Sequence, residues 1–240
     1  KLQIIELLNV YAYAHLVDVF GSVPYKEALD FTNVYPVYDK GDAIYTDLFA
    51  RLNNALSKLK PTAGSFGNAD LYYGGDVAAW VKFGNALKVR LAVTIADANN
   101  TLAKTSVEAA YNKAFASNDD DAMLYYQTSA PNYNQLYADL IASGRKDFVP
   151  ANTLVDAMST LSDPRMDRYF RDQIGGVYVG GKYGFPNSYN QCSHISATIE
   201  AADFPGIMLT YAEQCFYLAE AAERGYSVGK TAAAWYEEGI

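Results

Sequence analysis

Apolar residues recur every three to four positions along most of this chain, and this period constrains its fold more than any other feature. In residues 2–19 they lie on one face of a helix, and Gly21 with Pro24 ends the pattern. Residues 42–59 repeat it, with Asp42 as the expected N-cap. Because helix follows helix, the sequence predicts an all-α protein.

Asp76 is expected to cap a third, longer helix, in which Gly84 lies in the middle of the apolar stripe. Glycine costs about 1 kcal/mol in a helix interior relative to alanine. Its presence there indicates that another helix crosses close by. Further helices are expected at residues 104–116 (with Thr105 or Ser106 as N-cap), 133–142, 151–161, 207–224 and from about 230.

Residues 172–206 are the one long stretch without a helical period. This stretch contains six glycines and two prolines. Long irregular segments inside compact domains often carry function. We therefore expect the longest loop of the protein here.

Composition excludes several classes of function. With 27 acidic against 19 basic residues, the chain repels nucleic acid on average. No uncharged apolar run approaches the roughly 18 residues of a membrane helix. The sequence starts in mid-pattern and stops without a terminating signal, so we expect an internal fragment of a longer protein. Cys192 and Cys215 are expected as two buried free thiols, and with only His15 and His194 we expect no zinc site.

The stretch RGYSVGKT (224–231) resembles the end of a phosphate-binding loop. Such a loop needs four residues between its glycines and a preceding strand, but Gly225 and Gly229 enclose three residues and follow a helical pattern. The near-match at 176–183 has Tyr183 where the magnesium-binding hydroxyl should be. Small residues flanking Gly225 instead predict the turn of a tetratricopeptide-like helix pair.

Four segments resemble the SusD/RagB family, in particular its SusD-like branch. They are DVFGSVPY (18–25), GDVAAWVKFGNALKVRLA (75–92), SDPRMDRYF (162–170) and MLTYAEQCFYLAEAAERGYSVGKTAAAWYEEGI (208–240). They match the family's G-x-x-P turn, its W-x-K-F-x-N helix, its D-P-R turn and its Y-A-E helix, in the family's order. The resemblance spans nearly the whole chain but only about half of a full member.

The resemblance implies a cell-surface, lipid-anchored protein of the Gram-negative outer membrane, with residues 1–240 forming a single SusD-like α-helical domain. Its lipidated N-terminal part and its C-terminal part would lie outside this sequence. Such proteins capture glycans or oligosaccharides, and some members peptides, and pass them to a TonB-dependent (SusC-like) transporter without catalysis or cofactor. The residues alone predict only a helical-repeat binding protein. A tetratricopeptide-like scaffold or peptide-binding protein, and an enzyme, stay as alternatives.

Several charged residues invite a catalytic or metal-binding reading. Glu213 and Glu220 share one helix face about 10 Å apart, but no partner is apparent in sequence, so we expect no glycosidase pair. Residues 118–121 lack the glycine and glutamate of a calcium loop, so we expect a solvated connection. Arg90 is expected to pair with a carboxylate or to cap carbonyls, and His15 is expected to lie in the core or between helices.

Loop aromatics are the predicted ligand-binding residues, since rings on helix stripes are needed for packing. Sugar rings present apolar C–H faces that stack on aromatic planes. Asn187, with Asn190 and Gln191, would supply polar contacts to sugar hydroxyls. The predicted rings are Tyr72 and Tyr73 in the 61–75 loop and Tyr178, Tyr183, Phe185 and Tyr189 in the glycine-rich segment.

Overall fold

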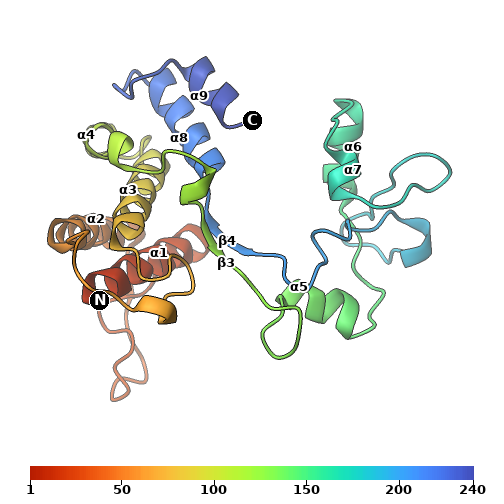
Figure 1. Ribbon diagram of the computed structural model, residues 1–240, viewed down its shortest axis with the longest axis horizontal. Helices are drawn as coiled ribbons and strands as arrows, with labels where there is room; N and C mark the ends of the chain where they lie inside the picture. Colours follow the sequence, from red (N-terminus) through yellow and green to blue (C-terminus); the bar gives the residue numbers. More distant parts are fainter. The chain divides into compact units, whose positions relative to one another are not determined.

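The computed structural model describes residues 1–240, which fold as two compact units (Figure 1). Unit 1 comprises residues 1–123 and 207–240, and unit 2 comprises residues 124–206. Unit 2 is therefore an insertion in the sequence of unit 1. The assignment of residues 1–240 to one family domain stays a prediction.

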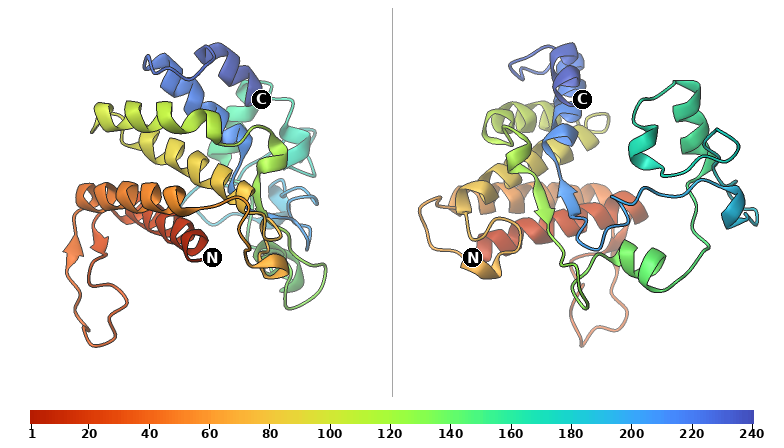
Figure 2. Two further views of the ribbon diagram at one scale, coloured as in Figure 1. Left: turned by 60° about the vertical axis from the view of Figure 1, so that its left-hand side comes forward. Right: turned by 45° about the vertical axis from the view of Figure 1, so that its right-hand side comes forward.

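Unit 1 is built from consecutive helices that pack in pairs, α1 with α2, α3 with α4 and α8 with α9 (Figure 2). This confirms the all-α prediction and the tetratricopeptide-like pairing. A two-residue ladder of β1 (Val23–Pro24) and β2 (Tyr38–Asp39) is antiparallel, and β3 (Ala122–Leu124) pairs with β4 (Gly206–Leu209). The helices are α1 (Leu2–Phe20), α2 (Gly41–Lys58), α3 (Val77–Thr94), α4 (Asn100–Ala110), α8 (Tyr211–Glu223) and α9 (Ala232–Glu238).

Gly84 marks the crossing of three helices, as the sequence predicts. A Cβ atom at Gly84 would lie 2.7 Å from Cδ2 of Leu56 on α2 and 3.2 Å from Cδ1 of Leu7 on α1. Leu7 and Leu48 are fully buried in the same core. A side chain at Gly84 would force at least the Leu56 side chain to shift, so glycine allows close packing at this crossing.

Polar side chains tie this bundle together at a few buried points. The side chain of Gln214 accepts from the Phe115 N–H at 2.8 Å and donates to the Phe115 carbonyl at 2.9 Å. Arg90 lies 3.7 Å from Glu213 and over the Tyr11 ring, which confirms its predicted carboxylate partner. Glu213 also accepts from the Tyr217 hydroxyl.

The sequence predicted the presence of the helices better than the residues at which they begin. Asp76 caps α3, accepting from the N–H groups of Ala78 and Ala79. Asp42 is not a cap, because α2 begins one residue before it, at Gly41, with Lys40 as N-cap. The fourth helix begins at Asn100 and not near Thr105 or Ser106, because Asn99 accepts from the Leu102 N–H and starts it earlier.

His15 is solvent-exposed on α1, so its predicted core position is wrong. The apolar stripe of α1 runs through Leu7, Val10, Ala14 and Val17, and His15 falls on the opposite side of the helix. Cys192 and Cys215 are free and buried, as predicted. None of the helices is long and apolar enough to cross a membrane.

The stretch 224–231 forms the predicted turn. Gly225 has φ +80°, its N–H donates to the Ala222 carbonyl, and the Tyr226 N–H donates to the Ala221 carbonyl. These bonds form a Schellman motif, which favours glycine at the left-handed position. The Ser227 N–H donates to the Glu108 carboxylate at 2.8 Å, so this amide already has a carboxylate of the protein as its acceptor.

Unit 2 has shorter helices and a small core. They are α5 (Gln135–Tyr137), which continues as a π-helical turn over Ala138–Ala142, then α6 (Asn152–Thr160) and α7 (Met166–Tyr169). Its buried cluster consists of Val155, Met158 and Phe170. Within residues 172–206 the only helical turn is η5 (Tyr189–Gln191), so the predicted irregular segment is confirmed.

Candidate functional site

Two exposed aromatic rings lie on a tight loop of unit 2. Tyr183 is 72% and Phe185 58% exposed. The Asn187 side chain closes this loop, accepting from the Lys182 N–H at 2.9 Å and donating to the carbonyls of Lys182 and Phe185 at 3.0 and 2.9 Å. Asn187 therefore orders the backbone that carries the rings, whereas the sequence suggested a polar contact to ligand.

Two further features of this loop are a close approach to Val149 at Gly181 and a charged side chain beside one of the rings. Gly184 has φ +72°, and a Cβ at Gly181 would lie 2.5 Å from Cγ2 of Val149. Lys182 Nζ lies 4.1 Å from the centre of the Phe185 ring, a cation–π contact. The Asn187 amide thus closes the loop, Lys182 contacts one of its rings, and both rings stay exposed to solvent.

Tyr189 follows this loop and lies in a charged cluster. The His194 ring lies against it, with ring centres 3.9 Å apart and planes at 36°. His194 Nδ1 is 2.6 Å from Oδ2 of Asp172, and Nε2 is 3.0 Å from the Tyr189 carbonyl oxygen. Arg171 donates to the Tyr189 hydroxyl at 3.3 Å and pairs at 2.6 Å with Glu200, which is buried. Tyr189 is therefore held at its hydroxyl, its ring and its carbonyl.

Burial alone would raise the pKa of Asp172. The hydrogen bonds that it accepts from the backbone N–H and the ring of His194 outweigh that effect and hold the pKa below its usual value. Asp172 is therefore a carboxylate at neutral pH and in mildly acid solution.

Tyr178 packs against the small buried cluster of unit 2. Its ring centre lies 5.5 Å from that of Phe170, and its hydroxyl donates to Asp167 at 2.6 Å. That hydrogen bond to a carboxylate is the main cause that raises the pKa of Tyr178. A role in binding ligand stays a prediction for Tyr178.

Tyr72 and Tyr73 lie in unit 1, edge-on against Trp80 at 6.0 and 5.1 Å between ring centres. The Tyr73 hydroxyl donates to the Asp120 carbonyl, and burial raises its pKa. Below them the Asp70 carboxylate accepts from Trp80 Nε1 at 2.6 Å. Tyr73 thus packs on the core, while Tyr72 lines an apolar hollow of about 250 Å³ with Ile4, Leu8, Phe66 and Leu71.

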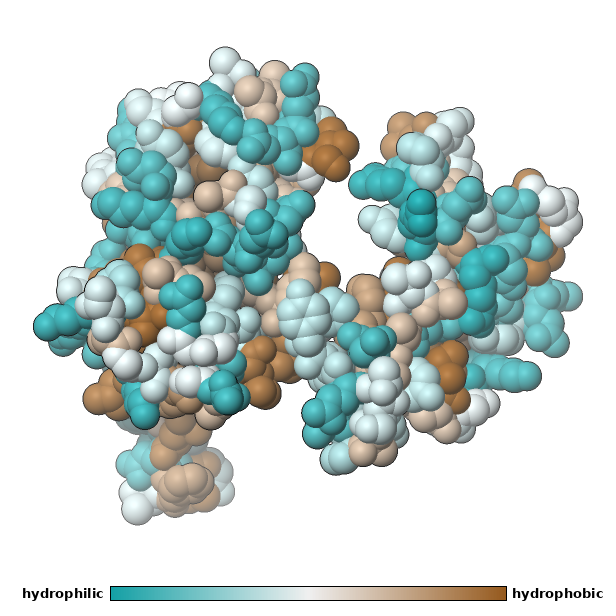
Figure 3. Space-filling model, in the orientation of Figure 1, coloured by the Kyte–Doolittle hydropathy of each residue, from teal (hydrophilic) through white to brown (hydrophobic).

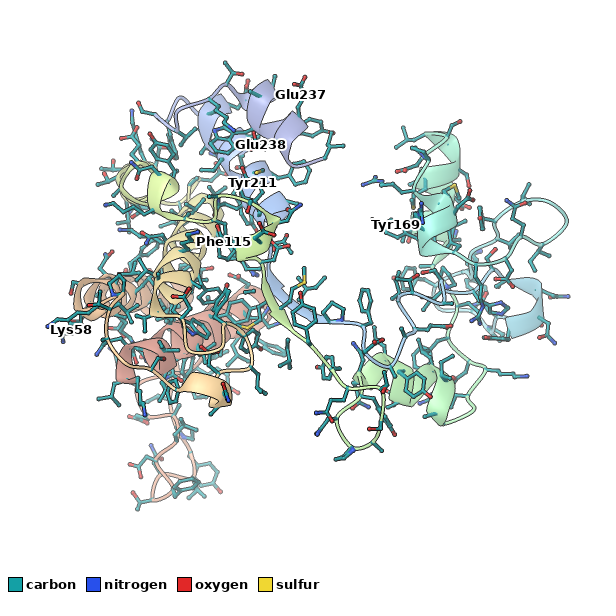
Figure 4. The ribbon with its side chains drawn as sticks, viewed as in Figure 1. Lys58, Phe115, Tyr169, Tyr211, Glu237 and Glu238 are labelled. Carbon is teal, nitrogen blue, oxygen red and sulfur yellow. The ribbon has the colours of Figure 1, made fainter.

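A second hollow of unit 1, of about 360 Å³, includes Phe115, Tyr211 and Glu238 (Figure 4). The Tyr211 hydroxyl donates to Glu238 at 2.5 Å, and Lys230 pairs with the same carboxylate. Burial and this hydrogen bond raise the pKa of Tyr211. The polar side chains of Tyr211, Lys230 and Glu238 in this hollow are therefore bonded to one another.

The acidic residues near 118–121 bind backbone and side-chain groups of the protein itself. Asp120 pairs with Lys82 at 2.6 Å and accepts from the Ala116 N–H, and Asp121 accepts from the Tyr211 N–H. Glu220 pairs with Arg224. The structure contains no group of three or more His, Cys, Asp or Glu that could hold a metal ion.

The structure thus groups five of the seven predicted residues in unit 2, with Tyr72 and Tyr73 in unit 1. Sequence reasoning missed Arg171, Asp172 and His194, whose side-chain partners are 18 to 29 positions away. It also missed Tyr169, which is 38% exposed at the end of α7 (Figure 4). The excess of tyrosine was the only available signal for Tyr169.

The sequence and the fold match a known family. A SusD-like family model, described as starch-binding and associating with the outer membrane, matches residues 1–240. None of the curated proteins matches the chain.

Solved structures with the same fold include three of 28% identity. The match to a SusD homologue from Bacteroides uniformis covers 99% of this chain and 51% of the homologue, with a TM-score of 0.87. The match to a chitin-binding SusD homologue from Flavobacterium johnsoniae covers 99% of this chain and 51% of that protein, with a TM-score of 0.86. The match to a SusD-like protein from Bacteroides thetaiotaomicron covers 98% of this chain and 50% of that protein, with a TM-score of 0.79. The chain spans about half the length of these relatives. It belongs to the SusD-like family.

Proposed function

We propose that this chain is the part of a cell-surface glycan-binding protein that takes up oligosaccharides through the exposed rings of Tyr183 and Phe185. The carrying observation is that two large aromatic rings are exposed to solvent on a loop that the Asn187 side chain closes by hydrogen bonds. Sugar C–H faces stack on such rings. Exposed Asn190 and Gln191 lie a few residues further on and supply hydrogen-bonding groups for hydroxyls.

The family supports the ligand class. Its description is starch-binding, and one structural relative of 28% identity is chitin-binding. Both are glucose-type polymers with apolar ring faces, and both suit an aromatic platform. We extend the proposal to binding without catalysis, because the family is described by binding alone.

The same proposal includes a lipid anchor and a TonB-dependent, SusC-like transporter to which the glycan is delivered. The support is the family's association with the outer membrane. Co-purification of a transporter with the tagged parent protein tests this part separately from glycan binding.

A peptide-binding or scaffolding role is the second candidate, favoured by one observation. The loop between β1 and β2 exposes several apolar side chains, and apolar colour gathers at the bottom of the space-filling view (Figure 3). Among them are Leu29 at 84%, Phe31 at 98% and Tyr35 at 91% exposed. An exposed apolar patch of this kind suits contact with another protein.

Calorimetry distinguishes the two candidates. We expect the protein to bind starch- or chitin-derived oligosaccharides with no product formed on prolonged incubation. Binding to unstructured peptides that is unaffected by these sugars would favour the scaffold, and release of shorter sugars would make the protein an enzyme.

A further inference from the structure

The glycine-rich segment of unit 2 differs in charge from the rest of the chain. The chain carries 27 acidic residues and a net charge of -8, yet it has no aspartate or glutamate between Asp172 and Glu200. Lys182 is the only lysine or arginine in that stretch. An anion held at this segment would therefore meet one cation and no carboxylate from the segment itself, whereas the acidic chain repels anions on average.

The two flanking carboxylates are engaged within the protein. Asp172 lies 2.6 Å from Nδ1 of His194 and accepts from the His194 backbone N–H at 2.8 Å. Glu200 is buried and pairs with Arg171 at 2.6 Å. Lys182 forms no ion pair with these or with any other carboxylate of the structure. Its positive charge is therefore available to a ligand.

The Lys182 ammonium lies beside the exposed rings of its own loop. Its Nζ is 4.1 Å from the centre of the Phe185 ring, and Lys182, Tyr183 and Phe185 are all exposed. A cation–π contact at an exposed site is weak, and the long lysine stem is flexible. The ammonium can therefore leave the ring face when a sugar stacks there, and it can pair with a charged group at the edge of that sugar.

The backbone that carries these side chains is fixed. The Gly181 N–H donates to the Pro150 carbonyl and the Gly181 carbonyl accepts from the Asn152 N–H, both at 2.8 Å, at the start of α6. The Asn187 side chain closes the loop. The one acidic residue of α6, Asp156, accepts from the Asn152 side chain. The rings and the ammonium are therefore presented together on an ordered backbone.

We propose that the ring loop, residues 182–187, binds an acidic sugar unit, whose apolar face stacks on the exposed rings while its carboxylate or sulfate pairs with Lys182. This inference rests on the proposed function and names the kind of sugar that the site prefers. In a hexuronic acid the carboxylate is attached at the rim of the sugar ring, so stacking and ion pairing occur in one pose. A neutral sugar of the same size makes the stacking contact alone.

Calorimetry with matched pairs of sugars tests this preference. One pair is a short oligogalacturonide and its methyl ester, which has the same rings without the charge. The other is a sulfated oligosaccharide and its desulfated form. An exposed ion pair predicts that the acidic member of a pair binds about two- to fivefold more tightly. This preference should shrink in about 1 M salt, where screening is strong. The pair with the larger ratio identifies carboxylate or sulfate as the group that is recognised.

The substitution Lys182→Gln removes the charge and keeps an exposed polar side chain. It should abolish the preference for the acidic sugar and leave binding of the neutral sugar unchanged. Lys58→Gln is the matched control, because Lys58 is exposed on α2 in unit 1 (Figure 4), and it should keep the preference. Both variants should unfold like the wild type. A preference that persists in Lys182→Gln overturns the assignment.

Two results separate this inference from the proposed function. If the neutral sugars bind through the rings and neither acidic sugar is preferred, the inference is overturned and the proposed function stands. If neither the acidic nor the neutral sugars bind, both are overturned.

Discussion

The two units of this protein are stabilised by different means. Unit 1 buries a continuous apolar core through paired helices, with Leu7, Leu48 and Phe83 fully inaccessible. Unit 2 has a cluster of only three buried apolar side chains and contains glycine turns, amide contacts and ion pairs such as Arg171 with Glu200. Apolar burial gives unit 1 a stable frame, and a polar network in unit 2 holds rings exposed to solvent. The comparison assigns the main stabilising core to unit 1, and the proposed function places ligand contact in unit 2.

Truncation in the core of unit 1 should have the largest effect. Leu48→Ala removes a fully buried side chain, and we expect a loss of about 2–5 kcal/mol in the free energy of unfolding. Phe31→Ala is the control, because Phe31 is 98% exposed and its loss should change stability by less than about 0.5 kcal/mol. Urea denaturation measures both, and equal effects would remove the distinction between core and surface.

Truncation in the small core of unit 2 should act locally. Phe170→Ala opens the cluster with Val155 and Met158, and we expect about 3 kcal/mol or less, limited by the stability of unit 2 itself. Hydrogen exchange should then increase in residues 151–196 and stay unchanged in α1 to α3. Equal loss of protection in α1 to α3 would show that the two units unfold together.

Acid should weaken one contact of unit 1 slightly. A hydrogen bond from Arg51, 2.5 Å long, lowers the pKa of Glu6 on α1 despite partial burial, and it ties α1 to α2. A lowered pKa gives stability that is present above the usual value and is lost as the pH falls through the folded value. For this part-exposed pair we expect about 1 kcal/mol or less.

Glu6→Gln provides the comparison for that contact. The difference in unfolding free energy between wild type and variant should be present at pH 7 and smaller at about pH 4, below the usual glutamate pKa of about 4.3. A difference that is the same at both pH values would mean that the charge of Glu6 does not contribute.

Helical period predicted the frame of unit 1 well, because a buried stripe repeats within a few residues. Asp76 was interpreted correctly because the amides that it caps are two and three residues away, and Gly84 because its place in the buried stripe marks the face that other helices contact. The start of α4 at Asn100 was missed because an earlier cap competes with Thr105. In unit 2, the role of Asn187 and the partners of His194 depend on contacts across loops that leave no periodic signal. The sequence therefore identified the aromatic residues, but it did not show which rings pack against the protein and which are exposed.

Calorimetry of a Tyr183→Ala/Phe185→Ala double variant tests the assignment of ligand contact to unit 2 most directly. Both rings are exposed, so the variant should unfold like the wild type. An aromatic contact contributes about 0.5–1.5 kcal/mol beyond area burial, so the loss of two should weaken oligosaccharide binding about tenfold or more. Tyr11→Ala, on a helix stripe of unit 1, should instead lower stability and leave affinity unchanged. Unchanged affinity in the double variant would contradict the account.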